Sequence, residues 1–494
     1  MKSKKIFLGL ALLGSLTWMS CSDKNSDSGR VAFDPSKAIV IEDFYPDSGG
    51  IATPMIITGS NFGSDTTGLK LWYVDEDGVR HKGGLVSSNG ERLYAYVPSG
   101  LTYKRNIKLE VTRDVNGDTI FGRAGRDFRY ITQTAVTTIV GMQTTDAHAT
   151  KCDKLLSSSL SAPGYLCVDD EDNIFIVEHR FDDGSTGYMD CRNEKNENVK
   201  GIVLRADTKK DELTLLQENG WNSSKINAPA YSTEPGFEGM YVPDDGGRVY
   251  WSLMKGNDYA VKKTQFINPE GYSTLDDKNY KFCFVINKND HMLYTVMYHG
   301  ELLRINPKTR RAELLLKKVG KDNGKSGDGG GNDSYCAFSP IQPNRLFISF
   351  SDCHEIWYVD VDQLSDKDSL TYHGEPYAGI AAYGSVNYTE GKGWEDGSLK
   401  NAKFNYPRQI CFTKDGRLYI ADSQNHCIRS IDTTQGANAR VTTPIGVPGS
   451  SGYTDGGVEL AKFNIPMGVA VSSDGEKVYI ADMKNQVIRE LSIK

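Results

Sequence analysis

Two stretches near the C-terminus share one pattern of apolar and polar positions. Residues 404–431 read FNYPRQICFTKDGRLYIADSQNHCIRSI, and residues 463–491 read FNIPMGVAVSSDGEKVYIADMKNQVIREL. Each stretch begins with an alternating run that buries every second side chain. It then passes through an Asp-Gly turn of the kind that closes tight hairpins, and continues into two further apolar runs. The pattern predicts three antiparallel strands in each copy, with a fourth at 440–445 after the first copy.

The repeated unit spans about 60 residues and is built from short strands, which is typical of solenoids, arrays and propellers. Four antiparallel strands per repeat make one blade of a β-propeller. The run AVTTIV at 135–140 can supply the missing fourth strand of the last blade and so close the ring. The sequence predicts an all-β ring of six blades, with five or seven left open. Looser copies of the pattern lie at 160–205, 237–253, 281–305 and 335–359.

Several motifs of the two clear copies resemble the NHL repeat, a family of propellers. These motifs are the Phe-Asn-x-Pro start, the Asp-Gly turn, the Tyr-Ile-Ala-Asp run and the final Ile-Arg. The resemblance implies an NHL-type six-bladed propeller over residues 133–494. Asp422 and Asp482 recur with the repeat, so we expect them to brace the hairpins rather than to take part in catalysis.

Some NHL propellers are metal-dependent lyases with histidine ligands inside the ring, which makes an enzyme one alternative. The chain has eight histidines, and His354 and His426 occupy one column of the repeat. The same column holds Gln486 in the last copy, whereas zinc needs three or four converging ligands. We therefore predict no catalytic residue, no metal site and no cofactor.

The first 21 residues have the layout of a bacterial targeting segment. Lysines at positions 2, 4 and 5 precede the apolar run 6–16, which is too short to cross a bilayer as a helix. The segment ends in Met-Ser-Cys21, which resembles a bacterial lipobox. The resemblance implies cleavage before Cys21 and lipidation of its thiol. An ordinary signal peptide is the alternative.

Residues 22–37 are polar and rich in Ser and Asp, which predicts a flexible tether. An acidic tether directly after a lipidated cysteine resembles the surface-export signals of lipoproteins with which gut Gram-negative bacteria take up polysaccharides. This resemblance implies a lipid-anchored position in the outer membrane, facing the cell exterior.

Residues 38–132 are predicted to form a separate unit of six or seven short strands, which fits a β-sandwich. Pro46, Gly49 and the stretch GSNFG at 59–63 resemble the IPT/TIG immunoglobulin-like family. For a sandwich beside a lipid anchor, we expect a spacer that lifts the propeller off the membrane. Direct ligand binding by this unit is the alternative.

The connections between predicted strands divide into tight turns and long loops. The turns from first to second strand, such as DDEDN, PDDGG, NKND, TKDG and SSDG, are all short. In a propeller these turns share one face, so we expect the long loops to lie together on the other face, where binding usually occurs. Aromatic side chains with polar neighbours suit sugars, because the rings cover apolar C–H faces. The candidate ligand-binding residues are Trp221, Tyr231, Tyr259, Tyr383, Trp394 and Tyr453, with packing onto the rim as the alternative for each.

The formal net charge of −7 argues against nucleic acid as a partner, because phosphate binding needs a clustered positive field. The lipoprotein signal with this domain order resembles the accessory surface glycan-binding proteins of polysaccharide-uptake systems. The resemblance implies a non-catalytic lipoprotein that binds an oligo- or polysaccharide beside an outer-membrane transporter complex. A propeller enzyme (a metal-dependent lyase or hydrolase) and a protein–protein interaction module are the alternatives.

Overall fold

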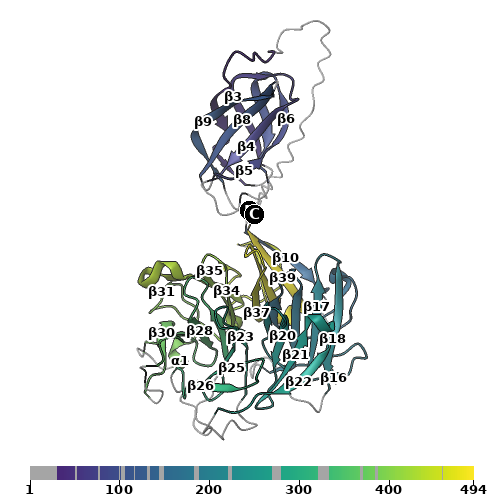
Figure 1. The fold of residues 1–494 in the computed structure, drawn as a ribbon, viewed down its shortest axis with the longest axis vertical. Coiled ribbons are helices and arrows are strands. Elements are labelled where there is room, and N and C mark those ends of the chain that lie inside the picture. The colour runs from purple at the N-terminus through teal and green to yellow at the C-terminus, as the bar shows by residue number, and fades with distance from the viewer. Residues whose placement is uncertain are drawn as a thin grey trace, which may run out of the picture. The chain divides into compact units, whose positions relative to one another are not determined.

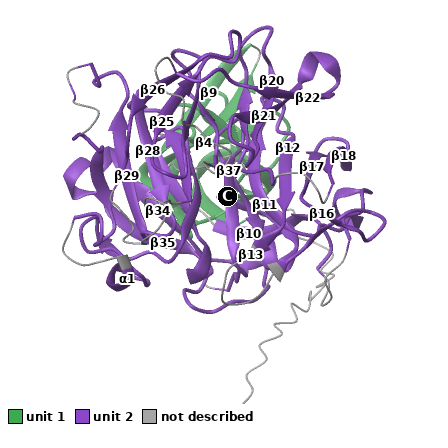
Figure 2. Ribbon diagram, turned by 90° about the horizontal axis from the view of Figure 1, so that it is seen from below, with its two compact units in different colours: residues 1–132, 494 green, residues 133–493 purple. Residues whose placement is uncertain are grey.

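A computed structural model describes most of the chain after residue 30, in two compact units. Unit 1 comprises residues 1–132 and unit 2 comprises residues 133–493 (Figure 2). No helix among the described residues is long and apolar enough to cross a membrane. The described residues are 31–50, 53–75, 78–98, 101, 106–115, 117–130, 134–143, 149–182, 188–220, 225–269, 280–320, 333–365, 367, 371–383, 388–458 and 460–493.

Unit 1 is built from two sheets that share one apolar core. Along β3 and β7 buried and exposed side chains largely alternate, so their sheet turns one face to the core and one to solvent. Ile57, Leu71, Leu93 and Leu109 are fully buried between the sheets. One sheet has the order β1 (Val40–Tyr45), β3 (Pro54–Gly63), β7 (Gly90–Tyr96), β6 (Gly84–Ser88); the other has the order β2 (Ser48–Gly49), β9 (Asp118–Tyr130), β8 (Asn106–Val115), β4 (Leu69–Val74), β5 (Arg80–Lys82).

The described part of unit 2 contains six antiparallel sheets of four or five strands (Figure 1). From the inside outward, the first sheet is β11 (Pro163–Val168), β12 (Ile174–His179), β17 (Gly201–Asp207), β18 (Glu212–Asn219), and the second is β19 (Ala230–Ser232), β20 (Gly239–Pro243), β21 (Val249–Met254), β22 (Val261–Gln265). The third is β23 (Val285–Ile286), β24 (Leu293–Val296), β25 (Leu302–Ile305), β26 (Ala312–Leu316), and the fourth is β27 (Ser334–Phe338), β28 (Arg345–Phe350), β29 (Glu355–Asp360), β30 (Glu375–Ala378). The fifth is β32 (Pro407–Phe412), β33 (Arg417–Asp422), β34 (Cys427–Asp432), β35 (Arg440–Ile445), β31 (Gly397–Ser398), and the sixth is β37 (Pro466–Val471), β38 (Lys477–Asp482), β39 (Val487–Ile493), β10 (Thr134–Val140), β36 (Gly456–Gly457).

Short elements complete unit 2. Two hairpins of two-residue strands follow β12 in the chain and join it to β17. These minor elements are β13 (Phe181–Asp182), β14 (Tyr188–Met189), β15 (Cys191–Arg192) and β16 (Asn198–Val199), the helix α1 (Tyr388–Gly391), and the 3-10 turns η1 (Leu155–Ser157), η2 (Lys255–Asn257), η3 (Ser423–Asn425), η4 (Thr433–Asn438) and η5 (Met483–Asn485).

The six innermost strands form a closed cycle. Each contacts the innermost strand of the next sheet, from β11 through β19, β23, β27, β32 and β37 back to β11. This arrangement is propeller-like. The predicted ring closure is confirmed, because β10 pairs antiparallel with β39, with Val136 opposite Leu491 (Figure 1). The first strand of unit 2 thereby covers an edge that would otherwise be open.

The two ends of this ring differ in what they carry. We call the end at which the innermost strands begin, near Pro163, Ser334 and Pro407, the loop face, and the opposite end the turn face. The described parts of the long connections 180–200, between β12 and β17, and 379–406, before β32, lie on the loop face, as predicted.

Two predictions about the connections were wrong. The innermost strand of the second sheet is β19, so the PDDGG turn joins the second strand to the third and lies on the loop face. The long connection from β29 to β30 joins the third strand to the fourth, so its described residues, 361–365, 367 and 371–374, lie on the turn face. The prediction missed β19 because it has only three residues, Ala-Tyr-Ser, which do not stand out as an apolar run.

The repeated aspartates brace the last two sheets, as predicted. Asp422 accepts hydrogen bonds from the backbone N–H of Asn405 at 2.7 Å and from the side chain of Asn425 at 2.8 Å. Its Oδ2 also lies 2.8 Å from Nη1 of Arg429, which is fully buried. Asp482 makes the same set of bonds one repeat later, with Asn464, Asn485 and Arg489.

The histidine column of the repeat joins neighbouring sheets. Nδ1 of His354 accepts a hydrogen bond from the backbone N–H of Tyr406 at 3.1 Å, and Nδ1 of His426 accepts one from Ile465 at 3.1 Å. Gln486 occupies the third position of the column and donates to the backbone carbonyl of Ser161 at 2.8 Å. This column therefore connects successive sheets around the ring.

Candidate functional site

Two of the predicted ligand-binding tyrosines lie together on the turn face, not on the loop face. Tyr231 is in β19 and stacks on Phe175 with ring centroids 5.6 Å apart. Tyr259 follows η2, is buried, and lies 5.1 Å from the same ring. Their hydroxyl oxygens are 3.5 Å apart. They pack against the start of β12, so the prediction that they line the loop face is wrong.

Three other predicted residues lie on the loop face but are spread over different places. The hydroxyl of Tyr383 donates to the carbonyl of Tyr377 at 2.7 Å. Trp394 donates from Nε1 to Thr443 in β35 at 3.0 Å. The Tyr453 hydroxyl lies 2.6 Å from Oγ1 of Thr138 in β10.

Trp394 and Tyr453 occupy the same position in successive repeats, and both contact the fourth strand of their sheet. They therefore lie at the outer edge of the ring rather than around its axis. Trp221 and Cys21 fall outside the described residues, so the structure does not place them.

We call the space that the six innermost strands enclose the channel. A different group of residues converges on its loop-face end, with Arg408 at the centre of the group. Arg408 is the second residue of β32 and is buried. Its Nη1 donates to the hydroxyl of Tyr335 at 3.2 Å and lies 3.6 Å from Oδ2 of Asp333. The guanidinium also lies over the ring of Phe181, 4.7 Å from its centroid. These contacts hold a permanent charge in one orientation.

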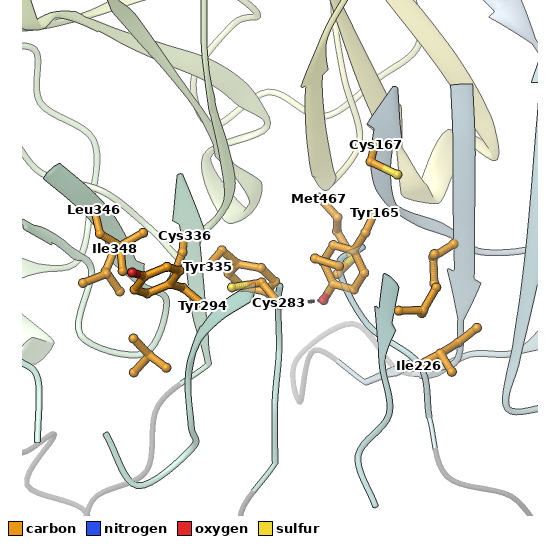
Figure 3. Close-up of a cluster of buried hydrophobic side chains, with 14 of the residues drawn as sticks. Tyr165, Cys167, Ile226, Cys283, Tyr294, Tyr335, Cys336, Leu346, Ile348 and Met467 are labelled. Carbon is orange, nitrogen blue, oxygen red and sulfur yellow. Dashed lines mark hydrogen bonds between the residues drawn. The ribbon is translucent and has the colours of Figure 1, made fainter. Parts of the chain in front are cut away.

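Tyr335 links Arg408 to the opposite side of the channel. Its hydroxyl oxygen lies 2.6 Å from that of Tyr165 in β11, and Figure 3 shows the two side chains pointing toward one another. Burial raises the pKa of Tyr165 to about 12 and raises that of Tyr335 as well. Both phenols therefore remain protonated and can donate hydrogen bonds.

The carboxyl group of Asp333 has an unusual pKa. Burial and the neighbouring charge of Asp352 together raise this pKa to about 6, although Arg408 opposes both effects. Asp333 is nevertheless partly exposed, so it can accept hydrogen bonds from a molecule outside the channel.

Charged and polar side chains surround this group. Burial lowers the pKa of Lys281 to about 8, and its ammonium donates to the backbone carbonyl of Gly247. Burial raises the pKa of Asp245 to about 6, and that carboxylate accepts a hydrogen bond from Asn227 at 2.6 Å. Burial lowers the pKa of His179 to about 3, so its imidazole is neutral near pH 7.

A group of three aromatic side chains lies next to Tyr335. Tyr280 and Phe282 lead into β23, and Tyr298 follows β24, so all three lie on the loop face. Each is partly exposed. Tyr298 lies 5.7 Å from Tyr280 and 6.1 Å from Phe282, and Phe282 lies 6.5 Å from Tyr335, measured between ring centroids.

We call these six residues the channel mouth: Tyr280, Phe282, Tyr298, Asp333, Tyr335 and Arg408. Sequence analysis missed this set. The signal that could have found it is Arg408, which occupies the position that Met467 fills in the other clear repeat. A permanent charge at an apolar position of an inner strand indicates a special role.

The turn-face end of the channel holds a cavity of about 550 Å³. Its wall is mostly apolar and comes from the ends of the innermost strands, with Tyr231 among the lining residues. Gln409 also lines it, but its amide already bonds the backbone of Leu166. Among the described residues, no group of three or more His, Cys, Asp or Glu side chains could hold a metal ion.

Comparison with known proteins identifies the repeat. The family model for the NHL repeat matches residues 404–429, the first of the two clear copies. Residues 404–429 are thus similar to an NHL repeat. The chain is 31% identical over 154 residues to Protein SUPPRESSOR OF QUENCHING 1, chloroplastic, of Arabidopsis thaliana, which covers 31% of this chain and 14% of that protein. It is 31% identical over 150 residues to human NHL repeat-containing protein 2, covering 30% and 19% of the two chains. The chain thus spans less than a fifth of these curated relatives.

Three solved structures with a similar fold come from Bacteroides. A protein of Bacteroides ovatus called an auxiliary nutrient binding protein has a TM-score of 0.62 at 17% identity, covering 94% of this chain and all of that one. A Bacteroides thetaiotaomicron protein of unknown function has a TM-score of 0.59 at 19% identity, and the match covers 94% of this chain and 100% of that one. A second auxiliary nutrient binding protein, from Bacteroides thetaiotaomicron, has a TM-score of 0.55 at 23% identity, with coverage of 94% and 99%. These similarities establish a shared fold.

Proposed function

We propose that this chain is a surface lipoprotein that binds an oligo- or polysaccharide at the channel mouth without breaking any bond. In this proposal the six sheets of unit 2 are the blades of an NHL-type propeller, and unit 1 is an IPT/TIG domain that acts as a spacer. A lipid on Cys21 anchors the chain in the outer membrane, facing the exterior. The bound glycan then passes to an outer-membrane transporter complex.

The channel mouth is the observation that carries this proposal. Partly exposed rings of Tyr280, Phe282 and Tyr298 can cover the apolar C–H faces of sugar rings. Near them, the partly exposed carboxylate of Asp333 offers a hydrogen-bond acceptor. The buried Arg408, held by Tyr335, lies 3.6 Å from that carboxylate. A small set of fixed polar groups next to aromatic rings is the composition of a site that orients a polyhydroxylated ligand.

The structural neighbours support a binding role. Two of them, from Bacteroides ovatus and Bacteroides thetaiotaomicron, are called auxiliary nutrient binding proteins, and they share this fold over 94% of the chain. A glycan is the nutrient that best fits the channel mouth, because its rings and hydroxyls match the aromatic and polar groups there.

Affinity gel electrophoresis of the chain from residue 22 tests the proposal. Each gel contains one polysaccharide: soluble starch, xylan, xyloglucan, galactomannan, β-glucan, levan or α-mannan. We expect one of these to retard the protein. Replacing Phe282 and Tyr298 together by Ala should weaken that retardation about tenfold or more, because two aromatic contacts are lost. The matched control is Trp394→Ala, a half-exposed aromatic residue at the outer edge.

The control also gives the result that would place the site elsewhere. If Trp394→Ala loses retardation while the variant with Phe282 and Tyr298 replaced by Ala keeps it, the glycan binds at the outer edge of the ring. Shortening of the glycan on prolonged incubation would make the protein an enzyme, with Asp333 as the first acid to examine, because its pKa of about 6 suits proton transfer.

A further inference from the structure

Unit 1 exposes a row of large side chains on the outer face of its sheet β1-β3-β7-β6. The exposed fractions are 76% for Tyr45, 40% for Ile56, 38% for Tyr94 and 46% for Tyr96. A spacer has no need of three exposed tyrosines on one sheet. Exposed aromatic groups that lie close together commonly mark a binding surface.

Strand register places these side chains next to one another. Tyr45 pairs with Ile56, and Ile56 pairs with Tyr94, so the three lie in one row across β1, β3 and β7. Tyr96 lies two residues further along β7, opposite Pro54. Paired residues in an antiparallel sheet point to the same face. We call the surface made by Tyr45, Ile56, Tyr94 and Tyr96 the tyrosine face.

The intervening residues confirm which way this face points. Phe44, Met55, Leu93 and Ala95 alternate with the tyrosine face along the same strands, and all four are buried in the core of unit 1. The tyrosine face is therefore the outward side of the sheet, and its residues do not belong to the core.

Sheet geometry sets the spacing of the rings. Neighbouring strands lie about 4.8 Å apart, so Tyr45 and Tyr94, two strands apart, stand about 10 Å from one another. Tyr94 and Tyr96 are separated by two residues of one strand, or about 7 Å. The three rings thus cover an area that several consecutive sugar rings can span.

Polar groups run beside the aromatic row. Asp43, Thr58 and Arg92 pair with one another across the same three strands, two residues away from the row of Tyr45, Ile56 and Tyr94. They can hydrogen-bond to hydroxyl groups of a molecule that lies on the rings.

We propose that the tyrosine face is a second glycan-binding surface of this chain, for the same glycan as the channel mouth. This inference rests on the proposed function. A flat sheet face suits the flat apolar side of a sugar ring, whereas the hot spots of protein interfaces lie in well-packed pockets. Two weak sites on one chain strengthen retention of a long polysaccharide, because binding at the first raises the effective concentration at the second.

The test uses the chain from residue 22 in gels containing each of the seven polysaccharides named above. In the gel that retards the wild type, replacing Tyr94 and Tyr96 together by Ala should reduce the retardation about fivefold or more. Adding Phe282→Ala and Tyr298→Ala to that variant should abolish retardation. Phe121→Ala is the matched control, because Phe121 lies in β9 of the other sheet of unit 1 and is 61% exposed.

Circular dichroism and the melting temperature of each variant separate lost binding from lost folding. If the Tyr94 and Tyr96 double variant melts early, Tyr45→Ala takes its place, because that ring is 76% exposed and contributes little to the core.

The outcomes distinguish this inference from the proposed function. Wild-type retardation in a folded tyrosine-face variant overturns the inference and leaves the channel mouth as the glycan site. Wild-type retardation in the channel-mouth variant, with loss in the tyrosine-face variant, overturns the channel mouth and supports the tyrosine face. Retardation by none of the seven polysaccharides overturns both.

Discussion

Glu178 is a carboxyl group that lies completely inside the first sheet of unit 2. It accepts hydrogen bonds from the backbone N–H groups of Ser161 at 2.7 Å and Ala162 at 3.1 Å, and another from the hydroxyl of Thr150. Burial nevertheless dominates and raises its pKa from the ordinary 4.5 to about 7. Glu178 thus fixes the segment before β11, but burial penalises its ionised form by more than these hydrogen bonds offset.

This pKa makes the stability of unit 2 depend on pH. Between about pH 4.5 and pH 7 the folded chain binds more protons at Glu178 than the unfolded chain does. The stabilisation is therefore complete below the unfolded pKa and is lost as the pH rises through the folded one. A shift of this size corresponds to about 3 kcal/mol.

Replacing Glu178 by Gln should remove that dependence. The variant has no proton to lose, so its stability relative to the wild type should rise by about 3 kcal/mol between pH 4 and pH 7.5. Urea unfolding at both pH values, followed by tryptophan fluorescence, measures the difference. Glu476→Gln, at an exposed turn, is the control. A constant difference between wild type and Glu178→Gln would show that Glu178 ionises normally in the fold.

At the scale of elements, the clear repeats were predictable and the second sheet was not. In the last two sheets the turn, the apolar runs and the aspartates agree, so strand order follows from the sequence alone. In the second sheet the innermost strand has only three residues, so the sequence predicts the strand before the PDDGG turn to be the innermost one instead. Local turn chemistry identifies a hairpin but not which pair of strands in the sheet it joins.

The residues of the channel mouth could not be predicted from the sequence for a related reason. Aromatic content marked the loops, yet Trp394 bonds a strand of its own sheet at the outer edge, and Tyr231 belongs to a strand. The channel mouth depends instead on which sheets the ring brings together. Arg408 and Asp333 come from neighbouring sheets, and their proximity follows from closure of the ring rather than from any local motif.

Closure through β10 gives a prediction at the same scale. Val136 is fully buried and pairs with Leu491, so Val136→Pro should break the ladder between β10 and β39. We expect a loss of about 3 kcal/mol or more, because proline removes an N–H group and does not fit a central strand. Urea unfolding measures this loss. Thr137→Ala, on the exposed side of β10, is the control. Equal stability of the two variants would mean that β10 does not close the ring in solution.

At the scale of the whole molecule, each unit has its own core and its own candidate surface. Unit 1 encloses Ile57 and Leu109 between two sheets and exposes the tyrosine face, while unit 2 presents the channel mouth. A protein that captures long polysaccharides gains from two such surfaces only if the chain is held where polysaccharide arrives. The anchor at Cys21 is therefore the part of the proposal on which the rest depends.

Cys21→Ser tests this anchor directly. Serine cannot form the thioether that holds the lipid, so the variant should leave the membrane fraction and remain in the aqueous phase, while the wild type partitions into detergent. Cys152→Ser, which removes a half-exposed thiol of unit 2, should behave as the wild type does. Protease added to intact cells should degrade the wild-type protein if it faces the exterior. Retention of Cys21→Ser in the membrane fraction would argue for another mode of attachment, and full protection from protease would place the protein inside the outer membrane, away from extracellular polysaccharide.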